Sequence, residues 1–213
     1  MSKLKFEITT SLDGYVAGPD PRDDQPLGEG GERLHQWVYG LRTWREQHGQ
    51  TGGAEGPDAE ILEESMADTG AAIMGRGMFG GASGPWDESW TGHWGDEPPF
   101  KMPVFVLTHH PREPLILGGG TTFTFVTDGI EAALKQARAA AGEKDVAISG
   151  GASVAQQYLK AGLLDELQLH VAPVLLGGGV RLFDNLDTEQ IELETARVVE
   201  SPEVTHLKYR VVR

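Results

Sequence analysis

The chain has 213 residues, no cysteine and a formal net charge of −14. The lack of cysteine excludes disulfides, thiolate zinc sites and cysteine nucleophiles, and the acidic charge disfavours general binding to nucleic acid, whose phosphates would be repelled. Hydrophobic residues make up 39% and charged residues 23%, which is ordinary for a globular protein and argues against a disordered chain.

Alternating polar and apolar residues at the start of the chain predict a strand over residues 3–10. Turn residues follow at 11–14, and residues 15–17 are a candidate continuation of the strand. A loop rich in Gly, Pro and Asp comes next, at 18–31. Apolar residues then recur every three or four positions over 32–48, which predicts a helix.

A second Gly-rich loop at 49–57 leads to a predicted helix that begins at Asp58. The apolar run at 71–74 is typical of a buried strand, and Gly75-Arg76-Gly77 follows it. Residues 80–103 hold three tryptophans among glycines and prolines and predict a long loop. We interpret this loop as a lid or a dimer contact, with packing of the tryptophans into the protein's own core as the alternative.

The rest of the chain predicts strands and helices that alternate, followed by a strand-rich end. The alternation favours an α/β fold with a parallel sheet, and the last 50 residues favour an antiparallel edge. No linker or repeat is evident, so we expect one mixed-sheet domain over residues 1–213. Strands are predicted at 104–107, 122–126, 145–148, 166–171, 180–183, 191–199 and 204–212, and helices at 129–141 and from 152 to about 162.

Three segments at the ends of predicted buried strands offer hydrogen-bond donors. After the strand predicted at 145–148, Gly150 and Gly151 lead into the start of a helix, where free N–H groups favour phosphate. On this local pattern alone, phosphate binding and a plain strand-to-helix turn are equally supported. Arg76 follows the strand predicted at 71–74, and its planar guanidinium suits phosphate because it can donate two hydrogen bonds at once. The strand predicted at 104–107 leads to Thr108 and His109. A dinucleotide laid across the carboxyl edge of the sheet would use all three segments.

Other chemistries find little support in the sequence. The adjacent His109 and His110 lie where neighbouring side chains face opposite sides, so we expect no metal site. No G-x-S-x-G motif and no Walker lysine follow a predicted strand. The acidic residues of the helix after residue 57 are mostly a solvated face, and Asp58 and Glu60 lie nearest to a possible cleft.

In order, these segments resemble the dihydrofolate-reductase-like family, and most closely the reductase domain of riboflavin-biosynthesis deaminase-reductases. The resemblance covers about residues 4–212, and only the series of motifs is specific. The segments are Ser11-Leu12-Asp13-Gly14-Tyr15-Val16-Ala17, Met74-Gly75-Arg76, Val106-Leu107-Thr108, Gly150-Gly151-Ala152-Ser153, Gly162-Leu163-Leu164-Asp165-Glu166-Leu167 and Pro173-Val174-Leu175-Leu176-Gly177-Gly178-Gly179-Val180-Arg181-Leu182-Phe183.

The resemblance implies a mixed, mostly parallel eight-stranded sheet with an antiparallel last strand and helices on both faces. It also implies NADPH as hydride donor. In this family the arginine after the Met-Gly pair grips the 2′-phosphate, here Arg76, helped by Thr108 and His109. Dihydrofolate reductases join the two glycines by a cis peptide. The implied cofactor-binding residues are Thr9, Val16, Ala17, Gly75, Arg76, Thr108, His109, Gly150, Gly151, Ala152, Ser153 and Val154.

The sequence also departs from the family pattern. Residues 30–57 read as an insertion with a helix of its own. Dihydrofolate reductases place a proton-donating acid early in the helix before the Met-Gly-Arg strand, and Asp58 lies near that position. Asp13 is a second candidate catalytic residue, and the resemblance implies that it holds the first turn. The zinc-dependent deaminase domain has no counterpart here.

These observations predict an NADPH-dependent reductase of a small heterocyclic substrate. The best match is reduction of the 5-amino-6-ribosylaminouracil type, in riboflavin biosynthesis. Dihydrofolate reduction and non-catalytic NADP binding on the same fold are the alternatives. By analogy we expect a homodimer. The start of the chain has no apolar signal-peptide core and no apolar run is long enough to span a bilayer, so we expect a cytoplasmic protein.

Overall fold

The computed structural model describes residues 2–81, 84–187 and 190–212. The chain divides into two compact units, each with its own contacts. Unit 1 consists of residues 1–6 and 69–164, and unit 2 of residues 7–68 and 165–213. Strand β1 (Leu4–Ser11) contributes to both units, because the division falls between its third and fourth residues.

In unit 1, the first residues of β1 start a sheet with the order β1-β7-β3-β4-β6-β5. All neighbours in this series are parallel except β5, which is antiparallel to β6. The other elements of the unit are β3 (Thr69–Gly75), α4 (Arg76–Phe79), β4 (Pro103–Leu107), β5 (Leu115–Ile116), η2 (Gly118–Gly120), β6 (Thr122–Val126), α5 (Gly129–Ala141), β7 (Asp145–Gly150) and α6 (Ala152–Lys160).

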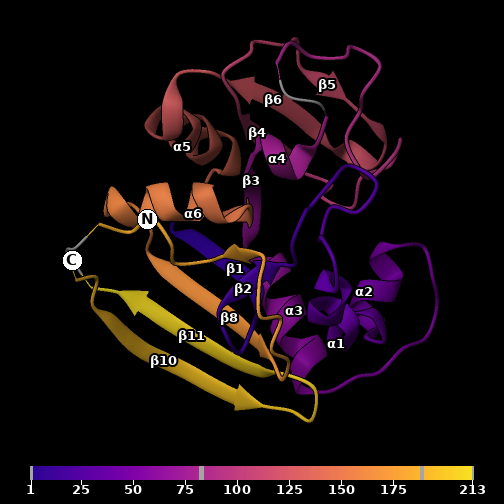
Figure 1. Ribbon diagram of the computed structural model, residues 1–213. Helices are drawn as coiled ribbons and strands as arrows, with labels where there is room; N and C mark the ends of the chain where they lie inside the picture. Colours follow the sequence, from indigo (N-terminus) through magenta and orange to yellow (C-terminus); the bar gives the residue numbers. More distant parts are fainter. Residues whose placement is uncertain (1, 82–83, 188–189, 213) are drawn as a thin grey trace. The chain divides into compact units, whose positions relative to one another are not determined.

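Both faces of the unit 1 sheet are covered. Alternate residues of β3, Ala72 and Met74, point into a buried cluster with Phe79 and Phe123. Helices α5 and α6 pack on the sheet away from this cluster and touch each other, since the hydroxyl of Tyr158 donates a 2.7 Å hydrogen bond to the carbonyl of Ile130 (Figure 1). The unit therefore has the layered arrangement that the alternation of strands and helices predicts.

The three tryptophans of the 80–103 segment pack against the Phe79 cluster. Trp86 meets Phe79 edge-on with their ring centroids 5.6 Å apart, and Trp94 stacks on Phe123 at 6.2 Å. The long loop is confirmed for its described residues, and the packing of its tryptophans agrees with the core alternative, while the lid and the dimer contact stay predictions. Tryptophan has a large apolar surface whose exposure to water is unfavourable, and here part of that surface packs against the unit's own aromatic core.

In unit 2, the remaining residues of β1 form one edge of the order β10-β11-β8-β1. β11 is antiparallel to both β8 and β10, and β2 pairs with β9 in a separate two-stranded sheet. The other elements are β2 (Tyr15–Ala17), η1 (Gly31–His35), α1 (Gln36–Tyr39), α2 (Arg42–Gln47), α3 (Pro57–Ala67), β8 (Glu166–Ala172), β9 (Val180–Arg181), β10 (Leu193–Glu200) and β11 (Thr205–Val211).

The single helix predicted over 32–48 is three short helices, η1, α1 and α2. The apolar face is as predicted, because Trp37, Val38 and Leu41 are buried in one cluster. The helix breaks after Gly40, where Leu41 takes an extended conformation with ψ 143°. Glycine is a poor helix residue and gives the chain freedom to turn at this point.

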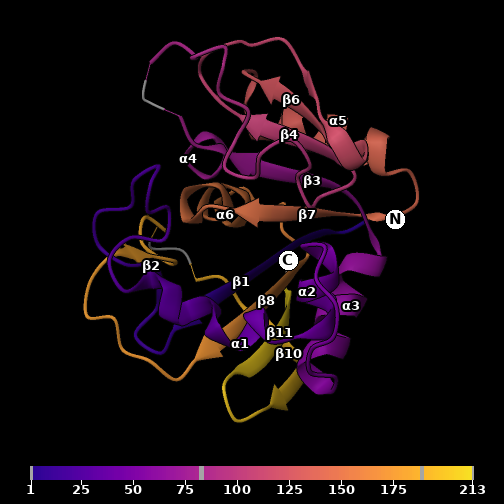
Figure 2. The same ribbon diagram turned by 90° about the vertical axis from the view of Figure 1, so that its right-hand side faces the viewer.

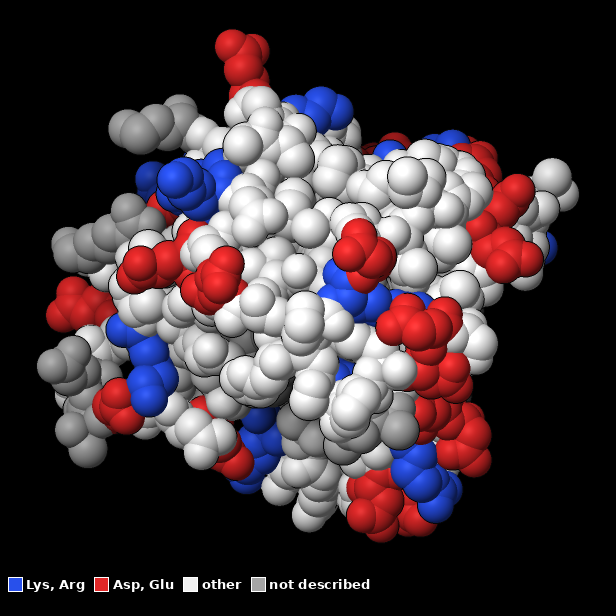
Figure 3. All heavy atoms as spheres, turned by 90° about the horizontal axis from the view of Figure 1, so that it is seen from above, with Lys and Arg blue, Asp and Glu red and all other residues white. Residues whose placement is uncertain are grey.

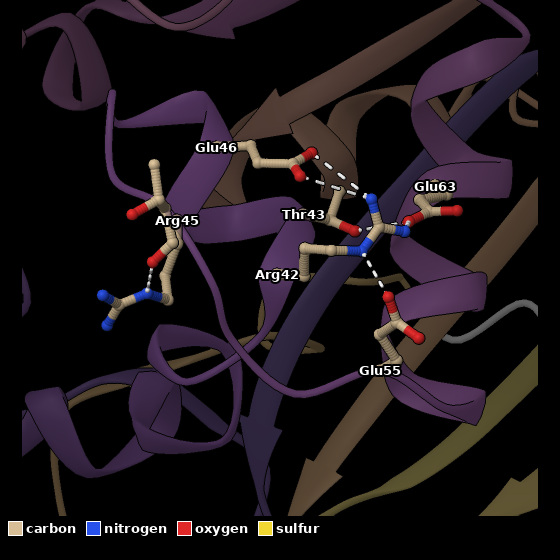
Figure 4. Close-up of polar contacts among 7 residues, drawn as sticks. Arg42, Thr43, Arg45, Glu46, Glu55 and Glu63 are labelled. Carbon is tan, nitrogen blue, oxygen red and sulfur yellow. Dashed lines mark hydrogen bonds and ion pairs between the residues drawn. The ribbon is translucent and has the colours of Figure 1, made fainter.

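Arg42 ties this insertion to helix α3. Its guanidinium lies 2.6 Å from Glu63 of α3, 3.2 Å from Glu55 in the preceding loop and 3.3 Å from Glu46 of its own helix (Figure 4). The three carboxylates raise the pKa of Arg42 above its usual value, with Glu46 the largest cause. One cation thus holds three successive segments of unit 2 together.

The class of fold is as predicted, a mixed and mostly parallel α/β sheet, with two differences in detail. Within the residues that the structure describes, the main sheet has nine strands in place of the predicted eight, because the two-residue strand β5 adds an edge. Antiparallel pairing is not limited to the last strand, because β11 is antiparallel to β8 and β10, and β5 is antiparallel to β6.

Acidic side chains gather along the rim of the face seen in Figure 3, with basic ones interspersed. No helix in the described part of the chain is long and apolar enough to cross a membrane.

Candidate functional site

In unit 1, the three predicted donor segments lie at one edge of the sheet. β7, β3 and β4 are adjacent and parallel, with Met74 in register with Gly150, and Gly75 with Leu107. The residues that follow these strands therefore come together at the carboxyl edge, where α4 also begins (Figure 2). Ligands of open α/β sheets bind at this kind of edge.

The two glycines after β7 have different structural requirements. Gly150 has φ 137°, and a Cβ atom there would lie 2.6 Å from the sulfur of Met78. Gly151 has an ordinary φ of −91°, and a Cβ atom on it would meet no described atom within 4 Å. The peptide bond between them is cis. The fold thus requires glycine at 150, whereas at 151 it leaves open space.

Gly151 is also the N-cap of α6, so the first N–H groups of this helix lie next to that space. Ser153 is exposed there, while Ala152 and Val154 are buried. The close approach of α6 to the sheet depends on Gly75, where a Cβ atom would lie 2.8 Å from Val154. These features place a helix N-terminus at the same edge as Arg76.

The guanidinium of Arg76 lies over an aromatic ring. Its guanidinium carbon is 3.8 Å from the ring centroid of Trp86, a cation–π contact. The indole N–H of Trp86 donates to the carbonyl of His110 at 2.8 Å. A second guanidinium, that of Arg112, lies 5.4 Å from the same ring. The Arg112 side chain is only 1% exposed and reaches the carbonyl of Glu88 at 2.9 Å.

Thr108 and His109 follow β4 and differ in exposure. Thr108 is buried, and its hydroxyl accepts a hydrogen bond from the backbone N–H of His110 at 3.2 Å, which closes a tight turn. His109 is exposed next to it. The turn thus presents the His109 side chain to solvent, while the Thr108 hydroxyl is engaged by the backbone.

In unit 2, the predicted nicotinamide-side residues are buried. Thr9, Val16 and Ala17 are 5%, 8% and 9% exposed. The indole N–H of Trp37 donates to the hydroxyl of Thr9 at 3.2 Å. Backbones approach closely beside Ala17, because a Cβ atom on Gly179 would lie 2.1 Å from the Ala17 carbonyl oxygen. Only glycine fits at position 179.

Asp13 accepts hydrogen bonds from backbone N–H groups of another segment, at 3.1 Å from Leu176 and 2.8 Å from Gly177. The hydroxyl of Ser11, together with these N–H groups, lowers the pKa of Asp13 to about 2. A carboxylate that is ionised at neutral pH holds no proton to donate. The geometry supports the role of Asp13 in holding the turn, and its catalytic role stays a prediction.

Asp58 lies in the first turn of α3 and joins a chain of buried side chains. Its Oδ1 is 2.9 Å from Nε2 of His206. Nδ1 of His206 is 2.5 Å from Nδ1 of His170, directly opposite it across the β8–β11 pair. Nε2 of His170 in turn is 2.7 Å from Oε1 of Glu7 on β1. Four titratable groups from four elements therefore form one continuous line.

Sequence reasoning did not find Glu7, His170 and His206. The only sequence signal is a polar side chain at every second position of the β8 and β11 segments, such as Gln168 and His170. Such alternation also marks a solvated face, so the strand register was needed to reveal the line. No group of three or more His, Asp or Glu side chains that could hold a metal ion occurs among the described residues.

The family model described as "RibD C-terminal domain" matches residues 2–207. Among curated proteins, none is similar to this chain in sequence.

Solved structures share the fold. A riboflavin biosynthesis protein from Shewanella sp. PV-4 matches over 100% of both chains with a TM-score of 0.63 and 24% identity. Acinetobacter baumannii RibD matches with 0.59 and 18%, and this chain, covered in full, spans 59% of it. Dihydrofolate reductase from Enterococcus faecalis matches with 0.51 and 16%, over 98% of this chain and 96% of the other.

Proposed function

The chain belongs to the RibD C-terminal domain family, and from this premise we propose that it is an NADPH-dependent reductase of a small heterocyclic substrate. The observation that carries the proposal is the edge of unit 1. There Arg76, Thr108 and the Gly150–Gly151 turn follow three adjacent parallel strands. A phosphate-rich cofactor is the ligand that such an edge suits.

The residues at this edge fit the phosphates of NADPH. The space beside Gly151, bounded by the first N–H groups of α6, suits a pyrophosphate. Arg76 suits the 2′-phosphate, because a guanidinium can donate two hydrogen bonds to one phosphate and the contact with Trp86 helps to position it. The exposed His109 adds a donor beside it. When bound, the cofactor supplies a hydride.

In unit 2, the proposed roles follow from the resemblance and from the local geometry. Thr9, Val16 and Ala17 would border the nicotinamide, and their burial gives them fixed positions. Reduction of a C=N or C=O bond by hydride also requires a proton at the heteroatom. Asp58 is the proposed donor, since its side chain remains 20% exposed while its Oδ1 bonds His206. Asp13, with its low pKa, is unsuited to that task at neutral pH.

The proposed substrate is a ribosylaminouracil, free or phosphorylated. The Thermotoga maritima protein with the same fold is described as a deaminase and 5-amino-6-(5-phosphoribosylamino)uracil reductase, at 12% identity and a TM-score of 0.60. A yeast neighbour is described as a riboflavin biosynthesis reductase, at 11% and 0.55. Dihydrofolate is the second candidate, because the Enterococcus faecalis neighbour is a dihydrofolate reductase.

NADPH oxidation by the purified protein tests the proposal. The substrates are 5-amino-6-ribosylaminouracil, its 5′-phosphate and dihydrofolate, each at saturating NADPH. We expect turnover of a ribosylaminouracil. Turnover of dihydrofolate alone would move the assignment to the second candidate. Tight NADPH binding without turnover of any of the three would favour a non-catalytic NADP-binding protein. We further propose that the protein is a cytoplasmic homodimer. Sedimentation of the purified protein checks whether it is a dimer.

A further inference from the structure

The line Glu7–His170–His206–Asp58 has a definite proton content. Each of its three hydrogen bonds needs one proton between its two atoms, and both ends are carboxylates. Two ionised carboxylates with one imidazolium and one neutral imidazole satisfy all three bonds. So does a protonated carboxyl at either end with two neutral imidazoles. All of these arrangements carry the same net charge, one negative, and differ only in where one mobile proton resides.

The geometry allows these arrangements to interconvert. Each hydrogen bond is 2.5 to 2.9 Å long, so a proton can pass along it without movement of heavy atoms. A shift of every proton by one bond moves the carboxyl proton from Glu7 to Asp58. Trp37 fixes both imidazoles, with ring centroids 4.9 Å from His170 and 5.2 Å from His206.

Only the ends of the line reach the surface. The side chains of His170 and His206 are 4% and 3% exposed, whereas those of Glu7 and Asp58 are 22% and 20% exposed. Burial lowers the pKa of His206 and so disfavours an imidazolium in the middle. The two carboxylates are therefore the groups of the line at which a proton can be exchanged with water.

We propose that this line is a proton-transfer chain that takes up a proton at Glu7 and supplies Asp58 with it. The proposal rests on the proposed function, in which Asp58 protonates the substrate. A ligand that covers Asp58 shields that end from water, and Glu7 then remains as the entry. His170 and His206 are positioning and relay residues, since both are buried and their hydrogen bonds join Glu7, Asp58 and each other.

The step balances in atoms and charge. The substrate carbon gains the hydride that the proposed cofactor supplies, the C=N or C=O π bond breaks, and its electron pair takes the proton of Asp58. That proton reaches Asp58 from Nε2 of His206, which takes one at Nδ1 from Nδ1 of His170, and His170 takes one at Nε2 from protonated Glu7. After the step both carboxylates are ionised, and Nε2 of His170 and Nδ1 of His206 keep one proton each. Glu7 then takes a proton from water and both imidazoles return to the other tautomer, which restores the starting arrangement.

Other polar and charged groups face this line and set its environment. Ser65 of α3 donates to Glu7. Lys208 lies two residues from His206 on β11 and pairs with Glu166 at 3.0 Å, and Arg197 of β10 pairs with Glu64 of α3 at 2.8 Å. His35 of η1 is close enough to His170 for their charges to repel. The nearby cations are thus neutralised by carboxylates of their own.

The first test reads the chain at equilibrium and needs no turnover. Histidine labelled with ¹⁵N reports the protonation of His206 by NMR across a pH titration. Glu7→Gln removes an end that His206 does not touch. We expect the titration of His206 to shift in this variant, and not in Glu60→Gln, the matched control, which removes an exposed carboxylate from the same helix turn as Asp58. An unchanged His206 titration in a folded Glu7→Gln protein would overturn the proposal.

The second test reads turnover. General acid–base catalysis contributes roughly 10²–10⁴-fold, and we expect Glu7→Gln to lower kcat by about tenfold or more with little change in KM. Glu60→Gln should keep the wild-type kcat. His206→Asn keeps a donor and an acceptor but cannot relay a proton, and it should lose kcat to a similar degree. A wild-type kcat in Glu7→Gln would overturn the catalytic role.

The two tests separate this inference from the proposed function. Linked titration with no turnover of any substrate by the wild type would defeat the proposed function while supporting the proton chain. Normal turnover without linked titration would defeat the chain and leave the proposed function standing. If His206→Asn fails to fold, Glu7→Gln decides, because glutamine closely matches glutamate in shape.

Discussion

Arg76 is the residue on which we propose that the choice between NADPH and NADH depends. NADPH and NADH differ by one phosphate, and a charge-assisted contact to it contributes about 1.5–3 kcal/mol, or roughly 10–150-fold in affinity. We predict that Arg76→Ala loses that factor for NADPH and leaves NADH binding nearly unchanged. Titration calorimetry of both cofactors on both proteins measures it. Equal affinity of the wild type for the two cofactors would count against the assignment.

Gly151 gives the sharpest distinction between a ligand site and a plain turn. A Cβ atom there meets no described atom within 4 Å, yet the branched side chain of a valine would occupy the proposed pyrophosphate space. We predict that Gly151→Val folds and loses NADPH binding. Gly150→Ala is the contrasting variant, because φ 137° and the sulfur of Met78 make it a fold defect. Circular dichroism and NADPH titration decide, and normal affinity in folded Gly151→Val would reduce the segment to a turn.

At the scale of elements, the 84–100 loop is part of the unit 1 core. We predict that Trp86→Ala costs stability towards the lower end of the ~3–5 kcal/mol typical of buried aromatic truncation, since Trp86 is half-buried against Phe79 and Phe125. NADPH binding should weaken as well, because the Arg76 guanidinium loses its contact with the Trp86 ring. Urea unfolding and NADPH titration measure the two effects. Unchanged stability with impaired substrate turnover would favour the lid interpretation.

How far the sequence predicts an element depends on how local its cause is. The Gly150–Gly151 turn and the position of Arg76 follow from residues that are neighbours in the chain, and both were predictable. The break after Gly40 was not, because an apolar face that continues through a glycine looks the same in one helix or in two. The line of Glu7 and His170 was beyond reach, since strand pairing joins residues 163 positions apart.

At the scale of the whole molecule, buried histidines predict sensitivity to acid. Burial lowers the pKa values of His35 and His206 in the folded protein, whereas both have ordinary values near 6.5 when unfolded. The unfolded chain therefore binds more protons just below that pH, so stability is full above about pH 6.5 and falls as the pH drops. Urea midpoints at about pH 7.5 and pH 5.5 measure this fall.

His35→Gln isolates one part of this effect. The Nδ1 atom of His35 is buried and has no hydrogen-bond partner among the described residues, so charging the ring brings no compensating bond. We predict a smaller loss of stability between the two pH values in this variant than in the wild type. The exposed His48 provides the control substitution His48→Gln. An equal loss in His35→Gln and wild type would exclude His35 as a source of the acid sensitivity.

The interrupted layout of unit 2 sets an order of assembly during synthesis. All residues of unit 1 have been made once the chain reaches Leu164, but unit 2 must wait for residues 165–213. Until then α1 and α3 lack the strands β8 and β11, and Trp37 lacks His170 and His206, the rings it packs against. A ribosome-bound chain therefore carries a complete unit 1 together with apolar residues of unit 2 that are still exposed. A chain truncated late in its sequence would remain in that state.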